Sequence, residues 1–411
     1  MVRHPNPEVL VVGAGPVGLV AALFLDQGGV RVQIIDMHQR TAQFSYALAI
    51  HPRTLRILDQ AGLSGALTAA GRKLTKVAFF DGREKRAEID YSRLASTHPY
   101  LLVVRQSLLE RTVEEELRRR DHKVLWGHRL QALVDDGASV QADIAELDQV
   151  ATGYPIARSE WVVQRTDTIQ PSFVIGADGY DSAVRRMAGI EMTEHHTALI
   201  FSIYEIETTG GDLPDEVRVV LDNDVTSVYW PLETGRCRWG FQIRDASLHD
   251  ASMPRLQQLI GARAPWFTAR PTQIYWSTLA SFASRLTRSF GKGNVWLAGD
   301  AAHQAAPVGV QSMNSGLVEA RELASRISQI QRAAAPRSLL QQFATDLHEQ
   351  WEWLLEPERA VVARQGADPW VRQNAARILA CMPASGHDLE PLLEQIGLNA
   401  APERRAAGPD A

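Results

Sequence analysis

The stretch from Val9 to Leu25, VLVVGAGPVGLVAALFL, constrains the fold of this chain more than any other feature. A β-branched run is followed by a glycine-rich turn and then by an apolar pattern typical of a helix. We predict a strand that ends at Val12 and a helix whose first N–H groups face a phosphate. The predicted turn and helix start contain Gly13, Gly15, Pro16, Val17 and Gly18. Glycines permit the tight turn and the close approach of ligand and sheet, so this region is a predicted pyrophosphate site.

A second apolar run, VRVQIID, supports the same fold because it ends in an acid. Asp36 follows the first strand by roughly 20 residues, the spacing at which an acid accepts hydrogen bonds from a ribose. A signal peptide and a membrane span are the alternatives for the apolar stretch. It lacks a basic flank and a small-residue cleavage pattern, is shorter than the roughly 20 residues of a span, and contains turn residues. We therefore predict a dinucleotide-binding unit of Rossmann type.

Length and composition are those of a globular enzyme with more than one domain. The 411 residues exceed the usual single-domain size, and 45% hydrophobic with 22% charged residues permit a large core. The formal net charge of −5 gives no electrostatic reason to expect nucleic acid or an anionic membrane as a partner. Cys237 and Cys381 have no metal-ligand spacing, so we predict neither a metal site nor a disulfide framework and expect a reducing cytoplasm.

Two further glycine-containing segments follow predicted strands: GADGYDSAVRR from Gly176 to Arg186, and GNVWLAGDAAHQAAP from Gly293 to Pro307. We expect all three segments at the carboxyl ends of strands, where ligands of open α/β sheets bind. Asp178 and Arg185 can hold the second turn through an ion pair or backbone hydrogen bonds, and the alternative for Asp178 is a helix cap. The alternative for Asp300 is likewise an N-cap, of a helix near Ala301. His303 is interpreted as a structural residue.

In this order the three segments resemble those of FAD-dependent aromatic hydroxylases, the group A flavin monooxygenases built like p-hydroxybenzoate hydroxylase. The resemblance covers roughly residues 7 to 345. It implies an α/β fold: a Rossmann-like FAD-binding domain, an inserted antiparallel-sheet substrate domain and a helical C-terminus. It also implies noncovalent FAD, NADPH or NADH as reductant, O2 and a small aromatic substrate. In that chemistry O2 adds at flavin C4a, and the resulting hydroperoxide transfers one oxygen to the ring.

The resemblance further implies which residues contact the cofactor. Asp178 lies where the flavin pyrophosphate passes, and Asp300, after Gly299, accepts hydrogen bonds from the ribityl chain. Arg105 and Gln106 match a position that binds the FAD ribose or pyrophosphate, and the alternative for both is an exposed helix start. The remaining assigned residues are Leu130 and, in the loop beside the flavin ring, Pro307, Gly309, Val310, Gln311, Ser312, Met313 and Asn314. Backbone N–H groups of this loop, and of a helix expected to open near Ser315, would stabilise negative charge on reduced flavin.

Three positions depart from the family pattern. The loop reads PVGVQSMN where relatives typically have Pro-x-Gly-Gly-Gln-Gly-x-Asn, so Val310 and Ser312 replace two glycines. A β-branched residue resists positive φ, so either the loop has a different shape or the flavin is held less tightly. Tyr46 stands where relatives often have an arginine near phosphate, so docking of the nicotinamide cofactor would rely on other basic groups.

Between Glu191 and Phe290 short alternating strands predict an antiparallel sheet, with a hairpin turn at Glu233 to Arg236. The expected FAD-binding domain comprises residues 1–75, 101–190 and 285–345. The expected substrate domain comprises residues 76–100 and 191–284, and residues 346–411 form C-terminal helices and a tail.

Aromatic residues of the inserted sheet predict the substrate class. We expect Trp230 and Phe241 to face the loop at Pro307, and Tyr46 is also assigned to the substrate. Arg238 either binds a carboxylate or phenolate or is an exposed strand residue. Such a pocket fits a flat, multi-ring aromatic better than a sugar or an amino acid. The sequence reveals no catalytic base.

Other functions share parts of this pattern. A flavin-dependent halogenase would be expected to have Trp-x-Trp-x-Ile-Pro, and Trp351-Glu352-Trp353 does not continue in that way. A flavin reductase or oxidase, and a non-catalytic FAD-binding paralogue with a weakened loop, remain alternatives to aromatic hydroxylation or epoxidation.

Overall fold

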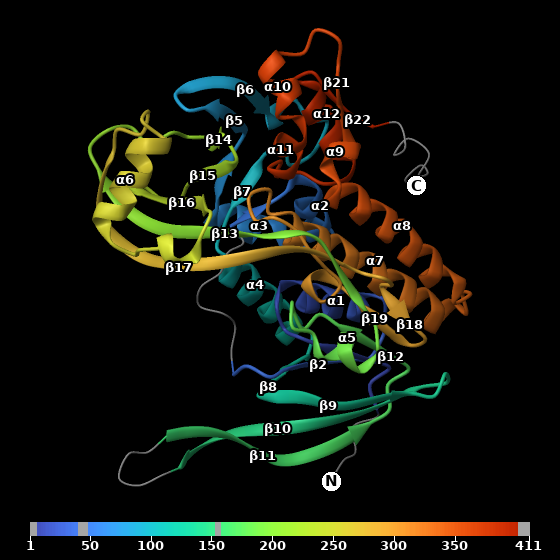
Figure 1. Cartoon of the computed structure of the whole chain (residues 1–411). Coiled ribbons are helices and arrows are strands. Elements are labelled where there is room, and N and C mark those ends of the chain that lie inside the picture. Colours follow the sequence, from blue (N-terminus) through green and yellow to red (C-terminus); the bar gives the residue numbers. More distant parts are fainter. Residues whose placement is uncertain (1–5, 40–47, 153–157, 402–411) are drawn as a thin grey trace.

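A computed structural model describes residues 6–39, 48–152 and 158–401 of the chain (Figure 1). Its central layer is a six-stranded sheet in the order β18-β19-β12-β1-β2-β8, in which all strands but β18 are parallel. The strands are β1 (Val9–Val12), β2 (Val32–Asp36), β8 (Val124–Trp126), β12 (Phe173–Gly176), β18 (Gly291–Lys292) and β19 (Val295–Leu297). The predicted strand ends at Val12 and Asp36 are confirmed, and the strand predicted before the second glycine segment is β12, which ends at Gly176.

Helices cover this sheet, and the first begins where the sequence predicts. α1 (Pro16–Gln27) has Gly15 as its N-cap and Pro16 at its first position, where a missing N–H costs nothing. Leu19, Leu23 and Leu25 are buried, so nearly the whole helix belongs to the core. It packs between α4 (Gln106–Arg119) and α7 (Gln311–Ala333). Smaller elements complete this part: β3 (Ala49–Ile50), α2 (Pro52–Gln60), α3 (Ser64–Ala70), β4 (Arg72–Leu74), β7 (Leu101–Val103) and α5 (Ala183–Met187).

A second sheet of eight strands stands beside this unit, in the order β20-β17-β13-β16-β15-β14-β5-β6. The expected antiparallel block and its hairpin at Glu233 are present, and β5 and β6 extend it, β5 pairing parallel to β14. The strands are β5 (Lys76–Asp81), β6 (Glu84–Asp90), β13 (Met192–Thr209), β14 (Val217–Asp222), β15 (Val225–Pro231), β16 (Arg236–Ile243), β17 (Arg270–Thr287) and β20 (His303–Gln304).

The two faces of this sheet belong to different cores. One face presents Phe201, Ile203 and Trp230 to a cluster that includes Val308 and Val310. The opposite face is covered by α6 (Met253–Arg263) and carries most of the other aromatic side chains, which are Tyr204, Tyr229, Trp239 and Phe241. The ring centroids of Trp239 and Phe241 are 5.2 Å apart, with the rings nearly parallel. The sheet therefore uses one aromatic face as core and turns the other toward the flavin-loop region.

A three-stranded antiparallel sheet that sequence analysis did not predict lies at the edge of the molecule (Figure 1). It consists of β9 (His128–Asp135), β10 (Val140–Thr152) and β11 (Arg158–Ile169).

The C-terminal part is mainly helical, as predicted, with one short strand pair. Its elements are α8 (Ser338–Leu355), α9 (Pro357–Ala360), β21 (Val361–Ala363), α10 (Pro369–Gln373), α11 (Ala375–Ala380), α12 (Leu389–Glu394) and β22 (Leu398–Ala400). Within the described ranges no helix is long and apolar enough to cross a bilayer.

Candidate flavin site

The three glycine-containing segments meet at one edge of the parallel sheet. β1, β12 and β19 are neighbours, so the turns that follow them emerge side by side. Gly13 has φ +106°, and a Cβ there would lie 2.2 Å from the carbonyl oxygen of Ala177. A Cβ at Gly18 would lie 1.9 Å from the oxygen of Gly13, whereas one at Gly15 would meet no atom within 4 Å. Gly13 and Gly18 thus allow the segments to pack, and Gly15 leaves open space where a ligand can approach.

Asp36 fixes the end of β2 to the glycine turn. One carboxylate oxygen accepts the N–H of Ala14 at 2.7 Å and the other accepts the N–H of His38 at 2.8 Å. A carboxylate has about four lone-pair positions, so both oxygens keep capacity for ribose hydroxyls.

Asp178 holds the start of α5, whose N-cap residue is Ser182, and this supports the structural alternative named for Asp178. Its oxygens accept the hydroxyl of Ser182 and the N–H groups of Ala183 and Val184, at 2.7 and 3.1 Å. Burial raises the pKa of Asp178, against the lowering effect of these hydrogen bonds. Arg185 donates to the carbonyl oxygens of Tyr180 and Ala301 at 3.2 and 3.0 Å, so backbone hydrogen bonds hold the second segment against the third.

Asp300 lies inside a single 3-10 turn, Gly299–Ala301, whose N-cap residue is Ala298, so Asp300 is not the N-cap of a helix that begins near Ala301. The Asp300 side chain is exposed, and no residue within the described ranges donates a hydrogen bond to its carboxylate. Protein atoms packed around this carboxylate partly desolvate it and raise its pKa, whereas the nearby His303 lowers the pKa. An acceptor with unused capacity at a strand end can bind the hydroxyl groups of a ribityl chain.

Directly behind Asp300 is a buried polar network that sequence reasoning did not find. The Nε2 atom of His303 is 2.6 Å from a carboxylate oxygen of Glu319, and both side chains are fully buried. The other oxygen of Glu319 accepts the indole N–H of Trp351 at 2.7 Å, and the His303 and Trp351 rings stack at 3.7 Å. These contacts support the interpretation of His303 as a structural residue.

In the loop from Pro307 to Asn314, Val310 adopts a left-handed backbone conformation, although it replaces a glycine of the family pattern. Val310 has φ +51° and ψ +34°, and α7 begins at Gln311 rather than near Ser315, the predicted start. The hydroxyl of Ser312 accepts the N–H of Ala305 at 3.0 Å. With valine and serine in place of the two family glycines, the turn contains one strained residue, Val310. No side chain caps the first N–H groups of α7.

Buried hydrogen bonds fix this loop to the rest of the protein. Asn314 donates to the carbonyl oxygens of Ala49 and Val310 at 2.9 Å and accepts the N–H of His51 at 2.8 Å. The ring nitrogen Nε2 of His51 is 3.0 Å from the carbonyl oxygen of Gly309. Burial lowers the pKa of His51 to about 3, so its ring is neutral and donates this hydrogen bond from Nε2. The half-buried side chain of Met313 packs against both large cores.

Other assigned cofactor residues point elsewhere in the structure. Arg105 is the N-cap residue of α4, and its guanidinium contacts the buried carboxylate of Glu205 and, at 3.7 Å, the exposed carboxylate of Glu233. Gln106 donates to Glu110 at 2.7 Å. Leu130 is buried in the core. Their contacts to FAD are therefore still predictions.

For the substrate side, the expected position of Phe241 and the exposed-strand alternative for Arg238 are wrong, whereas binding of a substrate anion by Arg238 is still a prediction. Phe241 lies on the face of the sheet that packs under α6. Its partner across the strands is Ser227, an odd number of residues from Trp230, and successive residues of a strand face opposite sides, so Phe241 and Trp230 lie on opposite faces. Trp230 does share a cluster with Val308 and Val310. Arg238 is buried, not exposed, and forms an ion pair with Glu205 at 3.0 Å. Tyr46 lies outside the described residues.

Comparison with known proteins identifies the family to which this chain belongs. A family model described as FAD binding domain matches residues 6–356, and the chain belongs to this family. The residues at the three strand ends fit FAD, which is the cofactor of the family. No group of three or more His, Cys, Asp or Glu side chains in the described part of the chain is placed to hold a metal ion.

Curated proteins with similar sequences are monooxygenases by name. The chain is 27% identical over 370 residues to pentachlorophenol 4-monooxygenase of Sphingobium chlorophenolicum, covering 87% of this chain and 65% of that protein. It is 29% identical over 349 residues to 6-methylpretetramide 4-monooxygenase of Streptomyces rimosus, covering 83% and 59%. The chain thus spans less than two thirds of the length of these relatives.

Solved structures share the fold. p-Nitrophenol 4-monooxygenase from Pseudomonas putida superposes with a TM-score of 0.73 at 22% identity, over 95% of this chain and 96% of that chain. Aklavinone-11 hydroxylase in complex with FAD and aklavinone superposes with a TM-score of 0.70 at 21% identity, over 95% and 74%.

Proposed function

We propose that this protein is an FAD-dependent monooxygenase that uses NAD(P)H and O2 to hydroxylate or epoxidise an aromatic, multi-ring substrate. The observation that carries the proposal is that the three strand-end segments meet at one edge of the parallel sheet. The loop beside them contains Val308 and Val310, which pack against the face of the eight-stranded sheet that bears Trp230. The names of the relatives support it, because they denote monooxygenases of aromatic compounds, including tetracenomycin A2.

The chain would bind noncovalent FAD through groups that the fold brings to one edge of the sheet. The turn at Gly13 and the start of α1 would hold the pyrophosphate, Asp36 the adenosine ribose, and Asp300 the ribityl chain. Uncapped N–H groups at the start of α7 would face the flavin ring and stabilise negative charge there. When bound, FAD supplies the redox chemistry, with NAD(P)H as electron donor and O2 as oxygen source.

The loop surroundings would exclude water from the reaction. Gly309 is so close to the carbonyl oxygen of Met382 that a Cβ would lie 2.6 Å from it. Gln311 is buried and donates to the carbonyl oxygens of Met382 and Ala384 at 2.7 and 2.8 Å. A C-terminal segment thus covers one side of the loop, and Trp230 packs with Val308 and Val310 in the buried apolar cluster beside it.

We further propose the domain division stated above, with residues 1–75, 101–190 and 285–345 binding FAD and residues 76–100 and 191–284 forming the substrate domain. Pairing of β5 with β14 supports it, because residues 76–81 thereby join the sheet formed by the later segment.

A visible spectrum followed by turnover assays tests the function. We expect yellow protein and NADPH or NADH oxidation stimulated by hydroxylated multi-ring aromatics, with a product heavier by one oxygen. Protein that stays colourless after incubation with FAD would contradict cofactor binding. Stimulation by small aliphatic substrates alone would refute the substrate class, and NAD(P)H oxidation that yields only hydrogen peroxide would indicate a flavin oxidase.

A further inference from the structure

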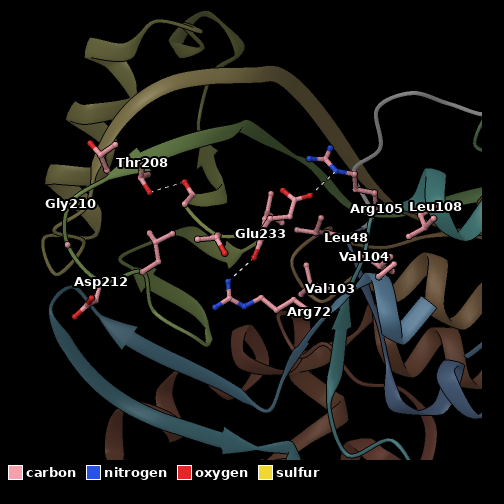
Figure 2. A pocket seen from close by; sticks show the side chains of 18 of the residues that line it. Leu48, Arg72, Val103, Val104, Arg105, Leu108, Thr208, Gly210, Asp212 and Glu233 are labelled. Carbon is pink, nitrogen blue, oxygen red and sulfur yellow. Dashed lines mark hydrogen bonds and ion pairs between the residues drawn. The ribbon is translucent and has the colours of Figure 1, made fainter. Parts of the chain in front are cut away.

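A cavity of about 730 Å³ lies between the start of α4 and the eight-stranded sheet, outside the cofactor residues described above except Arg105. It is bordered by the β15–β16 hairpin and by the loop after β13 (Figure 2). We call it the α4 pocket. Its volume falls within the range of roughly 300–1,000 Å³ that small-molecule sites occupy.

The floor of the α4 pocket is apolar and connects to the flavin loop. Leu48, Val104 and Leu108 line it from the FAD-binding side, and Leu232 from the sheet. Leu48 and the neighbouring Val103 belong to the same buried cluster as Val308 and Val310. A ligand lying on this floor would therefore be adjacent to the core that supports the flavin loop.

Charged groups are arranged unevenly around this floor. Arg72 donates to Leu232 and Asp215, and Arg105 contacts Glu205 and Glu233, so both guanidinium groups are already engaged. Arg111, on the second turn of α4, is exposed and has no hydrogen bond or ion pair with any residue that the structure describes. The unengaged positive charge thus lies on the α4 side of the pocket.

The opposite end of the pocket is acidic. Asp212 is exposed in the loop after β13, and Figure 2 shows it across the pocket from Arg105 and Leu108. Glu233 lies between these ends. A pyrophosphate group would meet these two carboxylates, whereas a flat molecule with one acidic group can place that group at Arg111, away from both of them.

We propose that the α4 pocket binds the part of the substrate remote from the reacting ring, and that the substrate is a multi-ring aromatic acid whose carboxylate or acidic phenolate pairs with Arg111. This proposal rests on the proposed function and names the substrate class of the same site. The apolar floor would hold the ring system, Arg111 would select the anion, and the other end of the molecule would reach the flavin loop.

Matched ligands test the proposal without requiring turnover. The probes are a dihydroxyanthraquinone carboxylate and the dihydroxyanthraquinone with a methyl group at the same position. Binding of each to the FAD-loaded protein is followed by the change in flavin fluorescence, with no NAD(P)H present. We expect the wild type to bind the carboxylate more tightly than the methyl compound. Arg111→Glu should weaken carboxylate binding about tenfold or more and methyl-compound binding less than about twofold, because only the former makes a charge-assisted contact.

Arg118→Glu is the matched control, since Arg118 is an exposed arginine two turns further along the same helix and outside the pocket. It should leave both affinities unchanged, and FAD content should be the same in all variants. Equal losses for both probes, no loss for the carboxylate, or no binding of either probe to the wild type would overturn the proposal. So would weakened NADP⁺ binding in Arg111→Glu with unchanged carboxylate binding, which would instead assign the pocket to the nucleotide. Failure of the proposed function appears separately, as absence of NAD(P)H-dependent oxygenation in the wild type.

Discussion

Asp300 follows β19, and its carboxylate accepts no hydrogen bond from a residue within the described ranges. Hydrogen bonds to a charged acceptor contribute about 1.5–3 kcal/mol, so Asp300→Ala should weaken FAD binding about tenfold or more. Titration of the apoprotein with FAD measures this, and Asp300→Asn, which keeps one acceptor oxygen, should give an intermediate affinity. The secondary structure of both variants should be unchanged by circular dichroism. Equal FAD affinity in wild type and Asp300→Ala would remove Asp300 from the site.

Glu110 gives a pH dependence of stability. Burial raises its pKa from 4.5 to about 7, and one carboxylate oxygen has no hydrogen-bond partner. Between these pH values the folded state holds a proton that the unfolded state has released, so stability falls as pH rises through this window and the penalty persists above it. The penalty amounts to about 3 kcal/mol. Relative to the wild type, Glu110→Gln should therefore gain stability between pH 5 and pH 8 in urea unfolding, and a constant difference would contradict the raised pKa.

At the scale of the loop, Val310 combines burial with left-handed backbone. A left-handed conformation costs a residue with a Cβ about 1–2 kcal/mol, which glycine avoids. We expect Val310→Gly to be at least as stable as Val310→Ala, the reverse of the usual order. Val308 is buried in the same cluster without positive φ, so Val308→Gly should be about 1 kcal/mol less stable than Val308→Ala. Urea unfolding of the four variants checks both orders, and the same order at both sites would mean that Val310 is unstrained.

Gln311 links the flavin loop to the segment that follows α11. Replacing it with Met keeps the volume but removes both hydrogen bonds, leaving the carbonyl oxygens of Met382 and Ala384 without their donor. We expect a stability loss of about 1–3 kcal/mol and more hydrogen peroxide per NAD(P)H consumed, because the loop is less well shielded. As a control, Gln341→Met alters a residue of α8 outside this contact. Unchanged coupling in Gln311→Met would show that the segment does not shield the reaction.

The strands that position the candidate site could be predicted from local sequence signals, whereas the helix start and the side-chain partners depend on contacts between distant residues. The strands ending at Val12 and Gly176 are encoded by short apolar runs before glycine turns, so they could be located directly. The start of α7 could not, because it depends on Val310 adopting a conformation that β-branched residues avoid.

Side-chain partners were harder to predict than strands. Glu319 and Trp351 are 32 residues apart, and no local pattern indicates that they meet behind His303. The expected place of Phe241 was wrong because strand register, which follows from pairing in the folded sheet, determines which face a residue occupies.

For the whole molecule, FAD would bind segments that are distant in the chain but adjacent in the folded sheet, at the ends of β1, β12 and β19. The unfolded chain cannot offer this arrangement, so FAD should stabilise only the folded state, by about 2.7 kcal/mol at a concentration 100 times its dissociation constant. We expect the melting temperature of the apoprotein to rise with FAD concentration, and to rise less with AMP, which lacks the groups that Asp300 would bind. Asp300→Ala should reduce the FAD shift and leave the AMP shift unchanged. Equal shifts with FAD and AMP in the wild type would show that the contacts beyond the first glycine turn contribute nothing to binding.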